Sequence, residues 1–283
     1  MSRLFSASLL ALGIAFAMPS AAQQSVPLPG QMRDTTTANG WQVKYLGGLN
    51  TGCQWNAYYQ NTFCNSNESY NWKAQRTYTN GVLNTAGYST AYRISDSRAQ
   101  QLVWNTNLPW ISRTSGGVDA NGYYSYVTSI TEDFSSLLAN GDSITFEVLK
   151  ISFASDDHMH AVVINGKEYG GFTPQPKDYR GWIQGYTTLT LTNTILQSYG
   201  INWNVNGPNT IEFIVHNNNS ADYGYIPGYG YFGSYNNVQN ASGFSAKIQA
   251  SYIHTPVPEP ETYAMLLAGL GLIGAVTRRR KSQ

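Results

Sequence analysis

The order of apolar and polar residues predicts β-strands along most of the second half of the chain. Residues 144–148 alternate between apolar and polar, and within 149–153 the apolar positions are shifted by one residue. A period of two is typical of a strand with one buried face, and a shift of one residue indicates a bulge or a strand switch near Val148 and Leu149.

Further strands are expected on the same pattern. Residues 158–164 are expected to continue as a strand that ends at Asn165-Gly166, a dipeptide that favours a type I′ hairpin turn. Residues 211–216 and 244–252 alternate and predict antiparallel strands that are buried on one face only. Helical signal is confined to a short segment at 134–139, which is followed by Asn140-Gly141. The pattern therefore predicts an all-β body.

The N-terminus has the pattern of a secretory signal peptide. A positive start at Arg3 precedes an apolar segment from Leu4 to Met18, and small residues at Ser20-Ala21-Ala22 supply a cleavage site. We expect residues 1–22 to be removed by signal peptidase after passage through the secretory translocon. The body then covers residues 23–255, a length that fits a single large β-sandwich.

The C-terminal residues 256–283 combine three parts in a fixed order. A proline-rich joint comes first, an apolar stretch from Tyr263 to Thr277 follows, and a basic end closes the chain. Pro258 and Pro260 fix two φ angles and favour an extended backbone before them, so the joint should be accessible to a protease. The apolar stretch has the minimum length for a single transmembrane helix. The joint and the basic end are Val257, Pro258, Glu259 and Pro260, and Arg278, Arg279, Arg280 and Lys281.

This tail resembles the PEP-CTERM sorting signal of Gram-negative bacteria, which an exosortase processes. The resemblance implies an exported protein that is held at the inner membrane during sorting and then reaches the cell surface or the extracellular matrix. Its partners would be the exosortase and, for a time, the inner membrane. A permanent tail anchor without processing is the alternative.

Charge and composition narrow the class of partner. Of the 17 Lys and Arg residues, five lie in the predicted signal peptide and tail. If the cut follows Pro260, Glu261 is the one residue lost of the 16 acidic residues, which leaves a body of net charge about −3. No basic patch remains for nucleic acid. Twenty-one tyrosines and seven tryptophans among many uncharged polar residues indicate a polar, uncharged surface that suits sugars.

Cys53 and Cys64 are the only cysteines. In an exported protein they are expected to form a disulfide, which would close a loop of 12 residues and stabilise the fold by roughly 3 kcal/mol. A metal site with two cysteines is the alternative, but residues 54–63 contain no His, Asp or Glu to complete it.

The segment from Thr128 to Asn217 carries a second resemblance. It contains Ala-Ser-Asp-Asp at 154–157, the Asn-Gly pair at 165–166, and the stretch 206–217 that ends in His-Asn. This order is similar to galactose-binding-like jelly rolls, in which such strands often form a polysaccharide-binding sandwich. It implies an antiparallel jelly-roll β-sandwich with long loops and, as in many jelly rolls, a possible Ca²⁺ ion at Asp156 or Asp157.

The residues from Asp156 to His160 could also hold another metal. On one strand Asp156, His158 and His160 would share a face, and His216 or His254 could complete the set, while Asp157 would lie opposite. The competing interpretation is that the aspartates bond to backbone amides and that the histidines lie on a solvated face, in a protein without a cofactor.

Aromatic residues after residue 180 are the candidates for sugar stacking, because a flat ring can pack on the apolar face of a sugar. They are Trp182, Tyr223, Tyr225, Tyr229 and Tyr231. The glycines at 228, 230 and 233 match G-x-G-x-x-G, but no amphipathic helix follows, so a dinucleotide site is not expected.

These observations predict an exported, non-catalytic protein that associates with exopolysaccharide. Glu132-Asp133 cannot act as a glycosidase pair because adjacent strand residues point to opposite faces, and no nucleophile elbow is present. The alternatives are a structural envelope protein without a ligand and a metal-dependent hydrolase at Asp156, His158 and His160.

Overall fold

The computed structural model describes residues 25–48, 54–56, 61–63, 69–94, 109–156, 158–173, 186–217, 224–226, 230–232, 239–257 and 260–281. The chain divides into two compact units. The larger unit is formed by residues 29–133 and 146–252, and the smaller unit includes residues 134–145 and the segment from Ile253 onward.

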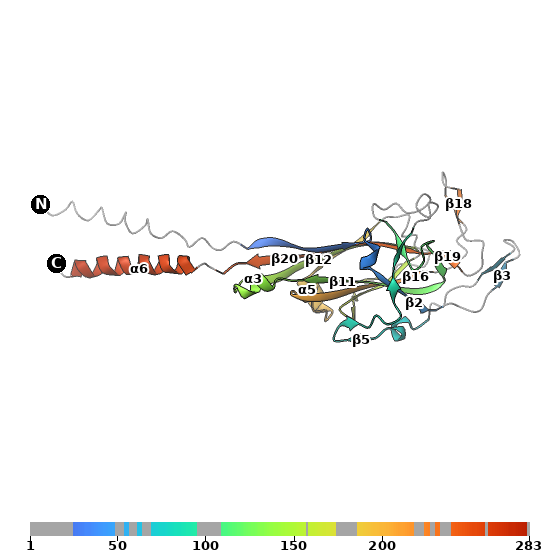
Figure 1. Ribbon diagram of the computed structural model, residues 1–283, viewed down its shortest axis with the longest axis horizontal. Helices are drawn as coiled ribbons and strands as arrows, with labels where there is room; N and C mark the ends of the chain where they lie inside the picture. The colour runs from blue at the N-terminus through green and yellow to red at the C-terminus, as the bar shows by residue number, and fades with distance from the viewer. Residues whose placement is uncertain are drawn as a thin grey trace. The chain divides into compact units, whose positions relative to one another are not determined.

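Two antiparallel sheets, each with six strands in the described part of the chain, build the body (Figure 1). The predicted antiparallel β-sandwich is confirmed. In spatial order, sheet A consists of β15 (Thr187–Thr192), β12 (Ser143–Asp156), β20 (Gly243–Thr255), β9 (Ile111–Ser112) and β8 (Tyr92–Arg93), with β1 (Val26–Asp34) also paired to β20. Sheet B consists of β14 (Lys167–Glu168), β13 (His158–Ile164), β16 (Gly207–Asn217), β11 (Gly122–Glu132), β2 (Gln42–Gly47) and β7 (Ser89–Thr90).

Short pairs and helices complete the described structure. The pairs are β3 (Gln54–Asn56) with β4 (Asn61–Phe63), β5 (Tyr78–Thr79) with β6 (Val82–Leu83), β10 (Val118–Ala120) with β19 (Gln239–Ala241), and β17 (Gly224–Ile226) with β18 (Gly230–Phe232). The helices are the 3₁₀ turns η1 (Ala38–Gly40) and η2 (Trp72–Gln75), and α3 (Ser135–Ala139), α5 (Asn193–Ser198) and α6 (Pro260–Lys281).

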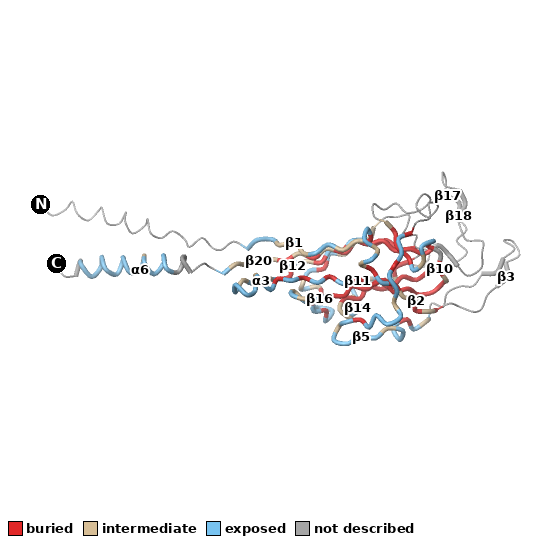
Figure 2. Tube along the Cα trace, in the orientation of Figure 1, coloured by how far each residue is buried: buried red, intermediate tan, exposed pale blue. Residues whose placement is uncertain are grey.

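The main core lies where aromatic side chains of the two sheets meet. Phe213 of β16 packs against Phe244 of β20 and Phe153 of β12, with ring centroids 4.8 and 5.9 Å apart. Trp41, just before β2, contacts Phe213 and Phe244. Burial of several large apolar side chains, each contributing roughly 1.5 to 3 kcal/mol, is the main source of stability here. Figure 2 shows the buried residues concentrated in the strands of the two sheets.

Several predicted elements are confirmed. In β12 the buried positions change from Phe146 to Leu149, as the sequence pattern indicates, but the predicted bulge or strand switch is not found in the pairing with β15, whose register is unbroken from Val148 to Phe153. Asn165 and Gly166 have φ angles of 49° and 77°, as a type I′ turn requires. The helix predicted at 134–139 is α3.

Two predictions about burial and helices need correction. Strand β16 was expected to be half buried, but every residue from Asn209 to Asn217 is buried, because a segment between residues 69 and 90 covers its second face. Helix α5 was not predicted: Thr192 ends β15 and caps α5 by accepting a hydrogen bond from the Ile195 amide, at 3.3 Å.

The C-terminal helix is confirmed as α6, which has 22 residues. A membrane-spanning helix had been expected there, but within the described residues no helix combines the length and apolar character needed to cross a membrane.

Candidate functional site

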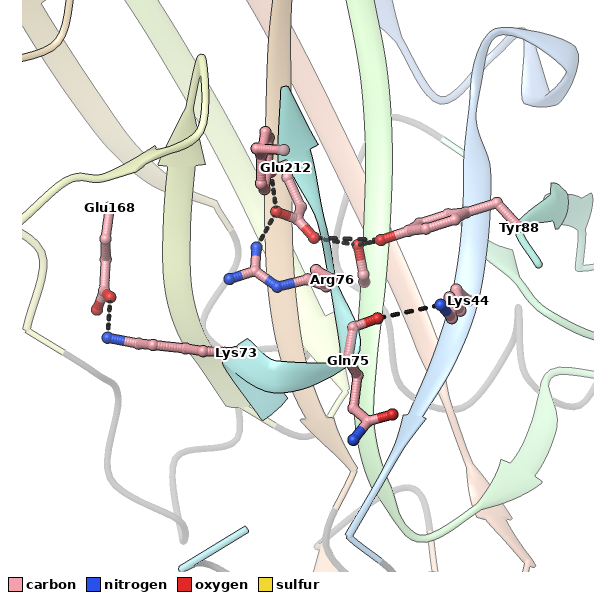
Figure 3. Close-up of polar contacts among 9 residues, drawn as sticks. Lys44, Lys73, Gln75, Arg76, Tyr88, Glu168 and Glu212 are labelled. Atoms are coloured by element: carbon pink, nitrogen blue, oxygen red, sulfur yellow. Dashed lines mark hydrogen bonds and ion pairs between the residues drawn. The ribbon is translucent and has the colours of Figure 1, made fainter. Parts of the chain in front are cut away.

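A buried carboxylate on the outer face of sheet B has an ion-pair partner and several hydrogen-bond donors around it. Glu212 lies in the middle of β16, between Val127 of β11 and Val163 of β13 in the register. Its side chain is 0% exposed, and it forms an ion pair with the guanidinium of Arg76, which is 7% exposed (Figure 3). An unpaired buried carboxylate is strongly destabilising, so Arg76 is the residue that stabilises the buried charge of Glu212.

Three hydroxyl groups complete the bonding of Glu212. Tyr78 donates a hydrogen bond to Oε2, and Ser125 of β11 donates to Oε1. Tyr88 donates to Ser125 Oγ at 2.9 Å and lies 3.4 Å from Oε1 of Glu212. Burial, followed by the charge of Glu212, raises the pKa of both tyrosines well above the usual value, so both keep their protons and act as donors.

The segment between residues 69 and 90 supplies most of these partners. The ring centroid of Trp72 lies 4.4 Å from Cζ of Arg76. This cation–π contact also excludes water from the ion pair. Trp72 joins an apolar cluster with sheet B residues; its buried members are Leu46, Trp72, Tyr123, Ala161, Val163 and Ile214. At the exposed margin, Lys73 pairs with Glu168 and Lys44 donates to the Gln75 carbonyl (Figure 3). The segment is thus fixed to the sheet by several buried contacts and by two polar contacts at the exposed margin.

Three histidines lie on the same face of sheet B. His158 of β13 is the register partner of His216 of β16, and His158 Nε2 is 2.9 Å from His216 Nδ1. Tyr123 stacks on His216 with ring centroids 4.2 Å apart, and His160 packs edge-on against Tyr123. Burial, with the adjacent His158 and His160, lowers the pKa of His216 to about 3. At neutral pH His216 is therefore an uncharged packing group.

The structure changes the geometry on which the metal hypothesis rested. Asp156 ends β12 of sheet A, whereas His158 begins β13 of sheet B, so they do not lie on one strand. The register also shifts between Met159 and Ala161, which places His160 at an irregularity. In the described part of the chain, no group of three His, Cys, Asp or Glu residues is placed to hold a metal ion. Asp157 lies outside the described residues, and His254 is bonded to Asp142 in the smaller unit.

Two of the five aromatic candidates for sugar binding are brought together. Tyr225 of β17 and Tyr231 of β18 are direct partners in an antiparallel hairpin. Directly opposite residues share one face of such a hairpin. Trp182, Tyr223 and Tyr229 lie outside the described residues.

The predicted disulfide also falls outside the described residues, at Cys53 and Cys64. Their sequence neighbours Gln54 and Phe63 are register partners in the β3–β4 hairpin. This register is compatible with the disulfide, which stays a prediction.

The sorting segment begins at the end of the sandwich. Thr255 ends β20, and the Val257 amide donates a hydrogen bond to Asp142. Pro258 and Glu259 lie outside the described residues, and Pro260 begins α6. Arg278 and Arg279 are exposed in the last turns of α6, which also contains Arg280 and ends at Lys281.

The profile of the PEP-CTERM protein-sorting motif matches residues 256–281. The chain carries a PEP-CTERM sorting motif. The motif implies an exported protein that is anchored at the membrane before sorting and is processed by an exosortase. The matched residues include the joint at 257–260 and all four basic residues at 278–281, as the sequence predicted.

Other comparisons add little. No curated protein matches the chain. Similar solved structures include a BuGH86 variant and wild-type BuGH86, each in complex with neoagarooctaose, at 14% and 12% identity and a TM-score of 0.20. Each match covers 48% of this chain and 17% of the other chain.

The network around Glu212, which also includes Arg76, Tyr78, Tyr88 and Ser125, was not predicted from the sequence. The available signal was weak: Glu212 occupies a polar position in an alternating strand, which normally faces solvent. Nothing in the Tyr- and Asn-rich residues 69–90 indicates that they cover the sheet.

Proposed function

We propose that this protein is a non-catalytic component of the cell surface or extracellular matrix that binds exopolysaccharide after sorting. The sorting motif supports the destination. Under this proposal the inner membrane holds the chain only until the exosortase acts, and the body carries the binding function. The protein needs no metal or other cofactor for this role.

The observation that carries the binding proposal is the pairing of Tyr225 with Tyr231 in the β17–β18 hairpin. Tyrosine combines an apolar ring with a polar hydroxyl, which suits a ligand with apolar ring faces and polar edges. Under this proposal the two tyrosines, which are register partners, stack on the sugar rings of the polymer.

The non-catalytic part of the proposal is supported by the bonding of two buried carboxylates, Glu212 and Asp119. Glu212 is bonded to Arg76, Tyr78 and Ser125, and Asp119 accepts from Ser112 and Arg113 at 2.6 and 3.1 Å. A carboxylate in such a network stabilises the fold and has no access to a glycosidic bond, which a glycosidase carboxyl group must flank directly.

Retention on purified exopolysaccharide tests the binding proposal. The wild-type body should co-sediment with the polymer, and Tyr225→Ala and Tyr231→Ala should each reduce retention, because removal of a stacking ring costs roughly 1 kcal/mol, or about fivefold in affinity. Tyr92→Ala is the matched control, since Tyr92 is an exposed tyrosine on β8. Absence of retention on every polysaccharide tested, or equal retention of all variants, would exclude the hairpin as a sugar site.

A structural envelope protein without a ligand is the second candidate. It is favoured by the burial of β16 under the segment between residues 69 and 90. In this arrangement Glu212 stabilises the sheet and does not contact a ligand. Deletion of the protein would then alter the matrix, although the purified body would have no affinity for sugar.

The hydrolase alternative at Asp156, His158 and His160 makes a different prediction. Purified protein would contain a stoichiometric metal ion and would shorten polysaccharide chains. We expect elemental analysis to find no stoichiometric metal and chromatography to find chains of unchanged length.

A further inference from the structure

Asp142 contacts the chain immediately before the sorting motif's Pro258. Its Oδ1 accepts a hydrogen bond from the Val257 amide at 2.9 Å, and its Oδ2 is 2.9 Å from His254 Nε2. All three residues belong to the smaller unit. One side chain therefore holds the backbone at Val257 and a side chain three residues earlier.

The turn after α3 fixes the position of Asp142. The Gly141 amide donates to the Leu138 carbonyl and the Asp142 amide donates to the Leu137 carbonyl, at 3.0 and 3.2 Å. Gly141 has a φ angle of +85°, and a methyl group on it would lie 3.3 Å from Val257 Cγ2. Glycine at this position thus permits both the left-handed turn and the close approach of Val257.

The same short stretch has a second attachment. Thr255 Oγ1 is 2.9 Å from Ser25 Oγ, near the start of the body. The Val257 amide, and then His254, lower the pKa of the Asp142 carboxyl group, so it is ionised at neutral pH. Residues 254, 255 and 257 are thus each held by a polar contact directly before Pro258.

We propose that Asp142 is a positioning residue for exosortase processing: it holds the Val257 backbone so that Pro258, Glu259 and Pro260 leave the body from a fixed point. This inference rests on the processing function of the sorting motif. Asp142 makes and breaks no covalent bond. A segment that is already ordered loses less conformational entropy when an enzyme binds it, so binding is tighter and processing is faster.

The test is pulse-chase labelling of the full-length chain in a host that carries the exosortase. Asp142→Ala removes both contacts, whereas Val257→Pro removes the amide that donates to Asp142 and also replaces a side chain inside the matched motif. Each should slow the conversion of precursor to mature protein roughly threefold to tenfold, as expected for loss of a hydrogen bond to a charged group. Asp142→Asn keeps an oxygen that can accept from Val257 and should recover part of the rate.

Glu147→Gln is the matched control, because Glu147 is an exposed carboxylate on the neighbouring strand β12, and it should be processed at the wild-type rate. The double variant Asp142→Ala with Val257→Pro should be slowed by less than the product of the two single effects, since both variants remove the bond between Val257 and Asp142. A general loss of folding would instead reduce the rates independently.

The experiment distinguishes failure of the sorting function from failure of the positioning role of Asp142. Glu259→Ala should block processing, and if it does not, the sorting function itself is wrong. If Glu259→Ala blocks processing while Asp142→Ala and Val257→Pro match the wild type, only the role of Asp142 is wrong. Strictly multiplicative effects of Asp142→Ala and Val257→Pro would also overturn it.

Discussion

At the scale of single residues, Glu212 shows how a solvent position in the sequence becomes a buried one. Its place in the alternation of β16 is ordinary for an outward-facing polar residue. Arg76 and Tyr78, more than 130 residues earlier in the chain, reach it because the segment between residues 69 and 90 packs on sheet B. Long-range pairing of this kind leaves no local pattern, so the sequence could not predict it.

The ion pair should make Glu212 and Arg76 much more important for stability than a nearby exposed pair. Arg76→Ala leaves the Glu212 carboxylate buried without its cation and should lower the free energy of unfolding by about 3 to 5 kcal/mol. Lys73→Ala removes a pair whose side chains are 60% and 44% exposed and should cost about 0 to 1 kcal/mol. Urea denaturation of the body measures both, and equal effects would contradict the assigned role of Glu212.

His216 should make the fold sensitive to mild acid. Its pKa is lowered to about 3 in the folded protein, whereas an unfolded histidine titrates near 6.5. Between these values the unfolded chain binds more protons, so the free energy of unfolding falls as the pH drops below about 6.5, by up to about 1.4 kcal/mol per pH unit.

Urea denaturation at several pH values between 7 and 5 measures this effect. His216→Gln should flatten the decline, with a residual slope from His160, whose pKa burial also lowers. His254→Gln serves as the comparison variant because it leaves His216 in place. An unchanged slope in His216→Gln would show that other groups cause the decline.

At the scale of elements, the sequence predicted those turns, helices and strands that depend on residues close together in the chain. The Asn165-Gly166 turn, the short helix α3 and the alternation of β20 all follow from residues close in sequence. The boundary between Asp156 and His158, where the chain passes from sheet A to sheet B, was interpreted as one continuous strand, although residues 155–158 are all polar and interrupt the apolar pattern. Burial of β16 on both faces depends on a covering segment that strand periodicity does not report.

The type I′ turn predicts that a side chain at Gly166 would strain the backbone. Gly166→Ala places a side chain at a φ of +77° and 2.9 Å from a ring atom of Tyr78, so it should destabilise the fold by about 1 to 3 kcal/mol. Gly40→Ala is the control, because no atom lies within 4 Å of the added methyl group and φ is not in the left-handed region. Thermal unfolding should rank Gly166→Ala well below Gly40→Ala, and the reverse order would contradict the turn assignment.

At the scale of the whole molecule, the chain combines a rigid sandwich with a short sorting segment. The sandwich and the sorting motif were both predicted from the sequence, because strand periodicity and the order of prolines, apolar residues and arginines are local features. The Asp142 contact with Val257 was not, since it joins residues 115 positions apart. The sugar-binding proposal depends on one hairpin pair, Tyr225 and Tyr231.

Intact-mass measurement of the protein recovered with secreted exopolysaccharide tests the central claim, which is delivery by sorting followed by association with the polymer. We predict that the wild-type protein found there has lost both residues 1–22 and the α6 segment, whereas Glu259→Ala keeps α6 and stays with the cells. A wild-type protein that retains α6, or a Glu259→Ala variant of the same mass and location as the wild type, would contradict the account.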